Sequence, residues 1–316
     1  MKRFETGDFF SKVLLFGEYS VIVEGRALMF PLERFSGKLT FEIHPGENET
    51  SMKKSNRKLR EFAEVIRLSE NFQSGDFTFD YQRMKADLDD GLYFCSNIPQ
   101  GYGVGSSGAL VAALFENYFH KPSEYDRFLK EDDIQQVVFV LAQMESFFHG
   151  NSSGLDPLCS LFNRPFVADE DKNIQILSSS VIDNFHDIQI FLVDTQKTGN
   201  TKPLVEAFMK QVEDYTVDLQ RMIYLNNLAI ETLLNRNRLE FFLTLKEISF
   251  FQWQYFEYML PDFLHPLWIE GMQTNNWYLK LCGSGGGGFF LGFTKNFDVV
   301  QHSFQKNNLN VFRVLN

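Results

Sequence analysis

Residues 99–109 read PQGYGVGSSGA, and the helix-prone run LVAALFENYF follows them directly. The glycines permit positive φ, so the backbone can turn tightly before the helix begins. The first N–H groups of such a helix have no partner within it, and they bind anions, above all phosphate. The stretch therefore predicts a phosphate-binding loop; the alternative is a flexible glycine loop that only caps a helix. The expected phosphate-binding residues are Gly101, Gly103, Gly105, Ser106, Ser107 and Gly108.

The same stretch also matches the dinucleotide-binding pattern GxGxxG at residues 103–108. That pattern functions where a strand runs directly into the first glycine, within a βαβ unit. Here residues 99–102 intervene, and no clear parallel strand follows the helix. An NAD-dependent oxidoreductase is kept as an alternative. The sequence has no GxxxxGK[ST], which excludes a Walker-type loop.

A second motif, ESFFHGNSSGLD, occupies residues 145–156 and ends an expected helix at residues 134–149. Glu145 falls about 20° from Ile134, within the apolar stripe of that helix. A carboxylate there must be paired or must bind a cation, because burying it bare is too costly. His149 lies one turn further on the same face, and Asp156 follows a Gly/Ser turn. The structural alternatives are a buried ion pair, a core histidine and an exposed turn aspartate.

Glycines also lie beside strand-like runs near both ends of the sequence. Residues 282–293 read CGSGGGGFFLGF, and a glycine run between strand-like flanks lets a backbone or a ligand approach closely. Near the start, the runs VLLF and YSVIV predict two paired strands within residues 9–32. Lys12 on the first strand is an ordinary edge residue unless Asp156 lies opposite it.

The order of these elements predicts an α+β fold with two lobes. The polar residues 46–60 predict a loop, which leads into a helix at residues 61–72. Three further segments predict strands that alternate irregularly with helical patterns: FTFDYQ, LYFCSNI and IQIFLV. Regular βαβ alternation is missing, which argues against a parallel doubly wound sheet. We expect an N-terminal domain at residues 1–180 and a C-terminal domain at residues 181–316.

Composition limits the partners. The chain has 316 residues, with 30 Lys and Arg against 41 Asp and Glu, so its net charge is −11 with His neutral. Nucleic acids and anionic membrane surfaces attract clustered positive charge, so we expect neither as a partner. The aromatic fraction of 16% together with the charged fraction of 22% argues against a disordered chain. Its 35 Phe residues are compatible with a homodimer interface and equally with a bulky core.

The three cysteines lie far apart in the sequence, with no CxxC pair. This pattern indicates reduced cysteines and a cytoplasmic protein. No apolar stretch reaches the length of about 18 residues that a membrane-spanning helix needs.

Taken together, five segments resemble motifs of the GHMP kinase superfamily (galactose, homoserine, mevalonate and phosphomevalonate kinases), most closely the mevalonate kinases. Residues 11–28, SKVLLFGEYSVIVEGRAL, resemble the family's opening GKVILFGEHAVVYGxPA. Residues 98–114 resemble its phosphate loop PxGxGLGSSAA, and residues 281–293 resemble its third motif GAGGGGC. Residues 145–157 are similar to the mevalonate kinase segment E…HGxPSGxDN, and residues 194–205 to NTKxPRxTxxLV.

The resemblance implies a two-lobed α+β kinase with its active site in the cleft. It implies that the hydroxyl of mevalonate is phosphorylated by ATP with Mg²⁺, giving phosphomevalonate and ADP for isoprenoid precursor synthesis. The implied catalytic residues are Asp156 and Lys12, and the implied metal ligands are Glu145 and Ser107, with Ser106 as the alternative to Ser107. The implied substrate-binding residues are Glu18, Tyr19, His149, Thr201, Gly285 and Gly286.

The sequence departs from the family pattern near the substrate. Tyr19 stands where mevalonate kinases usually have His, and Gly108 replaces the usual Ala. Gly199 stands where they often place an Arg, so Lys197 or Lys202 would have to recognise an acidic group. Phosphomevalonate kinase or another GHMP kinase is therefore an alternative, and a non-catalytic nucleotide-binding homologue is a third.

Overall fold

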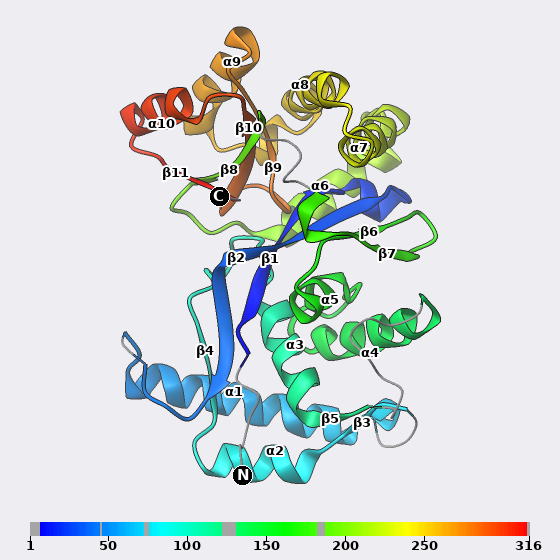
Figure 1. Ribbon diagram of the computed structural model, residues 1–316, viewed down its shortest axis with the longest axis vertical. Coiled ribbons are helices and arrows are strands. Elements are labelled where there is room, and N and C mark those ends of the chain that lie inside the picture. The colour runs from blue at the N-terminus through cyan, green and yellow to red at the C-terminus, as the bar shows by residue number, and fades with distance from the viewer. Residues whose placement is uncertain (1–6, 45, 73–75, 122–130, 182–186, 315–316) are drawn as a thin grey trace. The chain divides into compact units, whose positions relative to one another are not determined.

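Helices and strands account for most of the chain in the computed structural model, which describes residues 7–44, 46–72, 76–121, 131–181 and 187–314 (Figure 1). The side chains of residues 131–133 and 149 lie outside this description. The chain divides into two units, each built from separate stretches. Unit 1 comprises residues 1–12, 31–99 and 105–164, and unit 2 comprises residues 13–30, 100–104 and 165–316.

Unit 1 is mainly helical. Its helices are α1 (Glu49–Leu68), α2 (Tyr81–Asp89), α3 (Ser106–Tyr118), α4 (Glu131–His149) and α5 (Leu155–Phe162). Helix α3 packs against α4 and α5, and nearly every residue from Gly108 to Phe115 is buried. Small side chains at Gly108, Ala109, Ala112 and Ala113 let the neighbouring helices approach closely.

Helix α1 begins earlier than the sequence predicted. Asn48 and Ser51 form a reciprocal capping box, so the helix starts at Glu49 and the loop expected over residues 46–60 is wrong for most of its length. The polar character of that stretch reflects an exposed helix, because the buried residues of α1 begin only at Leu59. The helical pattern expected at residues 61–72 is confirmed as far as Leu68.

A five-stranded sheet contains β1 (Phe9–Phe16), β2 (Ala27–Thr40), β4 (Tyr93–Ser96), β6 (Phe166–Ala168) and β7 (Ile174–Ile176). Strand β2 pairs antiparallel with β4 near one end and with β6 near the other. The strands β1 and β2 each contribute residues to both units. A separate short pair joins β3 (Thr78–Phe79) to β5 (Phe119–His120).

The second strand expected near the N-terminus is wrong. Residues Ser20–Val23 form a short 3-10 helix, η1. The backbone turns through positive φ at Gly17 (130°), Tyr19 (63°) and Glu24 (66°), which breaks an extended strand. The β-prone side chains of YSVIV are therefore overridden by the turns on either side.

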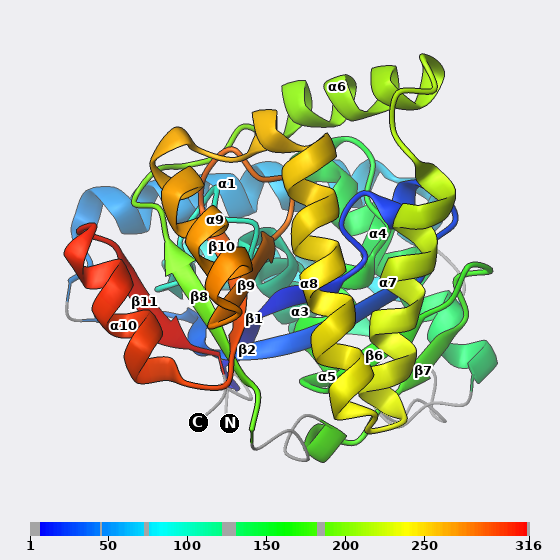
Figure 2. The same ribbon diagram turned by 90° about the horizontal axis from the view of Figure 1, so that it is seen from above.

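Unit 2 is built on an antiparallel sheet with the order β11-β8-β10-β9. Its strands are β8 (Gln189–Asp194), β9 (Trp277–Leu281), β10 (Phe289–Thr294) and β11 (Asn310–Arg313). Its helices are α6 (Thr201–Glu213), α7 (Leu219–Leu234), α8 (Arg238–Tyr255), α9 (His265–Thr274) and α10 (Phe297–Lys306). Figure 2 shows α7 and α8 side by side.

Both faces of β10 are covered. Phe290 meets Trp268 of α9 with ring centroids 6.2 Å apart, and Phe293 meets Phe241 of α8 at 6.0 Å. Residues 290 and 293 point to opposite faces of a strand, so helices lie against both sides. This explains why the strand reads FFLGFT without polar alternation.

The expected α+β fold class is confirmed. The strand pairs described above are antiparallel, and β5 after α3 pairs with β3 rather than with β4, so β4–α3–β5 is no βαβ unit. The division at residue 180 stays a prediction. Cys95, Cys159 and Cys282 form no disulfide bond with one another. Among the described residues, no helix is long and apolar enough to cross a membrane.

Candidate active site

Lys12 and Asp156 form an ion pair in unit 1. Lys12 comes from β1, where the strand is buried, and Asp156 lies in the first turn of α5. Lys12 Nζ lies 2.9 Å from Asp156 Oδ2, and the side chains are 8% and 33% exposed. The positive end of the α5 dipole favours a carboxylate at this place. Asp156 therefore lies opposite Lys12, so Lys12 is not the ordinary edge residue that the sequence alone allowed.

Glu145 of α4 accepts two hydroxyl hydrogen bonds. Ser107 Oγ at the start of α3 donates to Glu145 Oε1 at 2.9 Å, and Ser152 Oγ donates to Oε2 at 2.5 Å. Burial, followed by the nearby Asp156 charge, raises the pKa of Glu145 to about 7. The carboxylate on the apolar helix face is therefore partnered by two serine hydroxyls, and the nearby Lys12 charge also favours its ionised form.

This donor set fits a magnesium ion. Hard carboxylate and hydroxyl oxygens are the ligands that Mg²⁺ prefers, and it usually takes one or two carboxylates together with phosphate oxygens. Within the described part of the chain, no three His, Cys, Asp or Glu side chains gather as a metal-binding group. Glu145 and Ser107 could thus hold a cation that nucleotide phosphates also bind, and they do not form a closed all-protein cage.

The N-terminus of α3 lies against the same side chains. Gly105 precedes the helix with φ 76°, and no side chain caps the first N–H groups. A Cβ at Gly105 would lie 2.8 Å from Lys12 Cγ, and a Cβ at Gly108 would lie 2.8 Å from the Asp156 carbonyl carbon. Both glycines are needed for this close approach. A helix N-terminus, a lysine, a carboxylate and a Ser–Glu pair therefore meet within unit 1.

The earlier part of the glycine loop belongs to unit 2. Gly199 N donates to Gly101 O at 3.1 Å, and a Cβ at Gly103 would lie 3.0 Å from Cys282 O. The six residues expected to bind phosphate are thus divided. Gly101 and Gly103 pack against other loops of unit 2, while residues 105–108 start helix α3.

Four of the expected substrate-binding residues gather in unit 2 around the glycine run of residues 283–288. Tyr19 Oη donates to Ser284 O at 2.7 Å, and Thr201 Oγ1 shares a hydrogen bond of 3.0 Å with Ser284 Oγ. Gly286 N donates to Met259 O at 2.7 Å, and Gly285 is its neighbour in the same turn. Burial raises the pKa of Tyr19 well above its usual range, so the phenol stays a hydrogen-bond donor. Substrate binding by these residues stays a prediction.

The other two expected substrate contacts lie elsewhere. Glu18 pairs with Lys280 at 2.5 Å in unit 2, and both side chains are only 3% exposed. Its carboxylate thus has a buried cation as partner. His149 is the last residue of α4, and its side chain lies outside the described atoms. Their roles as substrate contacts stay predictions.

Two residues of these clusters escaped the sequence-based predictions. Ser152 donates a hydrogen bond to Glu145. The sequence feature that could have pointed to it is the Gly/Ser-rich turn between α4 and α5. Lys280 lies in the middle of the fully buried strand β9, WYLKL. A lysine inside such a run requires a partner, but the sequence cannot say that the partner is Glu18.

The chain is similar to known proteins in its fold, whereas its sequence alone finds no match. No protein-family model and no curated protein matches the sequence. Among solved structures, the chain is similar to L. major mevalonate kinase in complex with R-mevalonate, with 15% identity over 98% of this chain and 95% of that chain and a TM-score of 0.63. It is similar to Streptococcus pneumoniae phosphomevalonate kinase in complex with phosphomevalonate and AMPPNP, with 12% identity over 98% and 100% and a TM-score of 0.64. It is also similar to Lactococcus lactis galactokinase complexed with galactose, with 14% identity over 98% and 93% and a TM-score of 0.59.

These three proteins are GHMP kinases, and the likeness covers nearly the whole chain. The chain therefore has the GHMP kinase fold, and the resemblance carried by its motifs is confirmed at that level. At such identities the likeness concerns the fold, and the reaction has to be argued from the side chains.

Proposed function

We propose that this protein is an ATP-dependent kinase that phosphorylates a hydroxyl group of a small molecule, with mevalonate as the leading acceptor. The observation that carries the proposal is the Lys12–Asp156 ion pair of 2.9 Å beside the start of helix α3. Phosphoryl transfer needs positioning and charge neutralisation more than covalent chemistry. One cluster in unit 1 offers a base, a cation and an anion-binding helix start.

Each group has a role in this proposal. Asp156 accepts the proton of the acceptor hydroxyl while the hydroxyl oxygen forms a bond to the γ-phosphorus of ATP. The bond between the γ-phosphorus and the β–γ bridging oxygen breaks at the same time, and ADP leaves. The Lys12 ammonium stabilises the negative charge that develops on the hydroxyl oxygen. The first N–H groups of α3 bind phosphate oxygens.

Glu145 and Ser107 are the proposed hosts of Mg²⁺, with Ser152 orienting the carboxylate through its 2.5 Å hydrogen bond. A bound Mg²⁺ neutralises part of the phosphate charge. A cation bound there would add to the favourable charge that Lys12 already provides to the buried Glu145 carboxylate.

The sequence departs from the family pattern at Gly199, and the structure gives a reason to test several acceptors. Gly199 N is bonded to Gly101 O, and a Cβ at position 199 would lie 2.8 Å from Gly285 O. An arginine could not be added here without moving the loop. Lys197 lies over the Phe263 ring at 5.0 Å, and Lys202 is exposed, so either is a proposed contact for an acidic group.

A coupled assay of ADP release tests the proposal. The full chain is mixed with Mg·ATP and, in separate reactions, with mevalonate, phosphomevalonate, homoserine or galactose. Release with mevalonate is the expected result. Release with another acceptor only would replace mevalonate, and binding of Mg·ATP without release from any acceptor would favour a non-catalytic homologue. A titration with NADH, followed by fluorescence, should show no binding.

A further inference from the structure

Gly108 is a buried glycine in the first turn of helix α3, and its φ is not positive. Glycine makes a helix less stable than alanine does, and here no left-handed conformation requires it. Position 108 is also one where the chain departs from the motif that it resembles, which has Ala there. The missing side chain therefore needs another reason.

The first turn of α5 supplies that reason. A Cβ at Gly108 would lie 2.8 Å from the carbonyl carbon of Asp156, 2.9 Å from Pro157 N and 3.0 Å from Asp156 Cβ. Two of these atoms belong to the backbone, which cannot rotate away as the end of a flexible side chain can. Because carbon atoms in contact normally stay about 3.5–4.0 Å apart, an alanine would displace this turn by roughly 0.5–1 Å.

The same turn also lies close to helix α4. A Cβ at Gly154, which directly precedes α5, would lie 2.4 Å from Val138 O and 3.0 Å from Ala142 N. The start of α5 thus meets one neighbouring helix at Gly108 and another at Gly154, with no side chain on either glycine. Interiors are close-packed, so a displacement at Gly108 disturbs the contact with α4 as well.

This turn carries Asp156, whose Oδ2 lies 2.9 Å from Lys12 Nζ. A general base acts within hydrogen-bond reach of the proton that it accepts, and a misplacement of about 1 Å can lower a rate about 10²-fold. We propose that Gly108 is a positioning residue: because it has no side chain, the first turn of α5 lies directly against α3, and Asp156 is held in its pairing with Lys12. The part of this inference that concerns phosphoryl transfer rests on the proposed function.

Kinetics of Gly108→Ala test the inference. The new methyl group should lower kcat for ADP release by about 10- to 100-fold, because it moves Asp156. KM for ATP should change by less than about 3-fold, because alanine keeps the backbone N–H that a phosphate would bind. Ala112→Gly is the matched control. Ala112 is buried one turn further along α3, and its exchange weakens the helix without adding an atom near Asp156, so kcat should be kept.

The pairing of Lys12 with Asp156 can be measured without any turnover. Urea unfolding of Lys12→Met, Asp156→Asn and the double variant gives the coupling between the two side chains as a ratio of unfolding equilibrium constants. We expect a coupling of about 5- to 30-fold in the protein that retains Gly108. In the Gly108→Ala background it should fall below about 3-fold.

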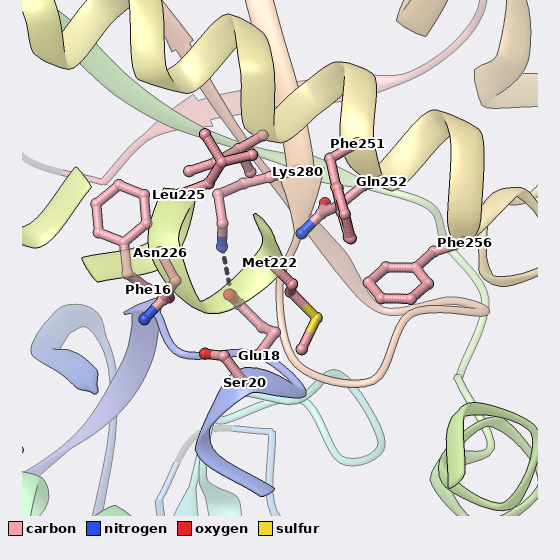
Figure 3. A pocket seen from close by; sticks show the side chains of 11 residues that line it. Phe16, Glu18, Ser20, Met222, Leu225, Asn226, Phe251, Gln252, Phe256 and Lys280 are labelled. Atoms are coloured by element: carbon pink, nitrogen blue, oxygen red, sulfur yellow. Dashed lines mark hydrogen bonds and ion pairs between the residues drawn. The ribbon is translucent and has the colours of Figure 1, made fainter. Parts of the chain in front are cut away.

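The buried pair Glu18–Lys280 is the control for this measurement. Figure 3 shows its two side chains pointing toward each other, and Lys280 Nζ lies 2.5 Å from Glu18 Oε1. The pair belongs to unit 2, whereas Gly108 belongs to unit 1. Its coupling, measured with Glu18→Gln and Lys280→Met, should therefore be the same with and without Gly108→Ala.

Three results would overturn the proposal: an unchanged Lys12–Asp156 coupling in the Gly108→Ala background, an equal loss of the Glu18–Lys280 coupling, or a near-normal kcat of Gly108→Ala. If the wild type releases no ADP with any acceptor, the proposed function fails, and the coupling still decides whether Gly108 positions Asp156. If Gly108→Ala does not fold, NMR of the wild type decides. A nuclear Overhauser effect between the α-protons of Gly108 and the β-protons of Asp156 is expected, and its absence would refute the packing.

Discussion

The Lys12 ammonium and the Asp156 carboxylate are 2.9 Å apart, one on a buried strand and the other in the first turn of a helix. The two ends of this pair differ in access to solvent, because the lysine side chain is 8% exposed and the aspartate 33%. The lysine is thus fixed from within the fold, while the carboxylate remains accessible to a bound molecule. This asymmetry suits a carboxylate that meets the acceptor and a lysine that supports it.

Asp156→Asn should lower the rate of ADP release by about 10²- to 10⁴-fold, because the amide cannot accept the hydroxyl proton. Binding of Mg·ATP, measured by fluorescence titration, should persist. Asp89→Asn is the control, since Asp89 forms an exposed ion pair of 2.7 Å with Arg60 and should leave turnover unchanged. Near-normal turnover of Asp156→Asn would remove Asp156 from the role of base.

Gly105→Ala should abolish most activity, because the new Cβ would lie 2.8 Å from Lys12 Cγ and displace the lysine. It should also cost about 1–2 kcal/mol of unfolding free energy, since the residue has positive φ. Gly91→Ala separates the two effects: Gly91 has φ 95° but nothing within 4 Å of the added Cβ. The control should lose stability and keep its turnover. Equal loss of activity in both variants would contradict the packing argument.

The stability of the metal-free protein should depend on the Glu145 carboxyl between pH 4.5 and about 7. The pKa of this group is raised in the folded state, so the folded protein binds more protons than the unfolded chain in that window. The unfolding free energy therefore falls as the pH rises through it. Glu145→Gln removes the cost of burying the charge and should be roughly 2–3 kcal/mol more stable than the wild type at pH 8, with little difference near pH 4.5.

Urea denaturation with EDTA present, at both pH values, measures this effect. The exposed Glu61→Gln serves as the control and should not change the pH dependence. A Glu145→Gln variant with the same pH dependence as the wild type would show that the buried carboxyl does not titrate in this range.

Glu18→Gln should cost about 3–5 kcal/mol of unfolding free energy, because it leaves the Lys280 ammonium buried without a carboxylate. The double variant Glu18→Gln/Lys280→Met should recover most of the loss, since neither charge remains. Glu247→Gln breaks the exposed ion pair with Arg221 and should change stability by less than about 1 kcal/mol. If the double variant were no more stable than Glu18→Gln, the buried charge could not be the cause.

Local patterns were enough to predict much of the fold and part of the site. Helix α3 follows the glycine loop as expected, and the stripe of α4 places Glu145 in a buried position, 4% exposed. These features depend on residues close in sequence, so periodicity and turn chemistry reveal them. The structure also brings Asp156 next to Lys12, a proximity that the sequence could state only as a condition.

What the sequence could not show depends on contacts between distant segments. The run YSVIV has β propensity, yet Ser20–Val23 form η1, and Tyr19 before them donates its hydroxyl to the distant Ser284. The partner of Lys280 is Glu18, which no local pattern connects to β9. Helix α1 was missed over its first turns because its residues are polar and its amphipathic signal begins only near Leu59.

The interleaving of the two units has a consequence for synthesis. Residues 13–30 belong to a unit whose remaining parts are residues 100–104 and 165–316. During translation this apolar segment leaves the ribosome long before the sheet and helices that cover it exist. Unit 2 must then close through contacts of high sequence separation, which slows folding and lengthens the time in which the nascent chain can aggregate. A chaperone that shields the first thirty or so residues would therefore raise the yield of folded protein more than one that acts on the completed chain.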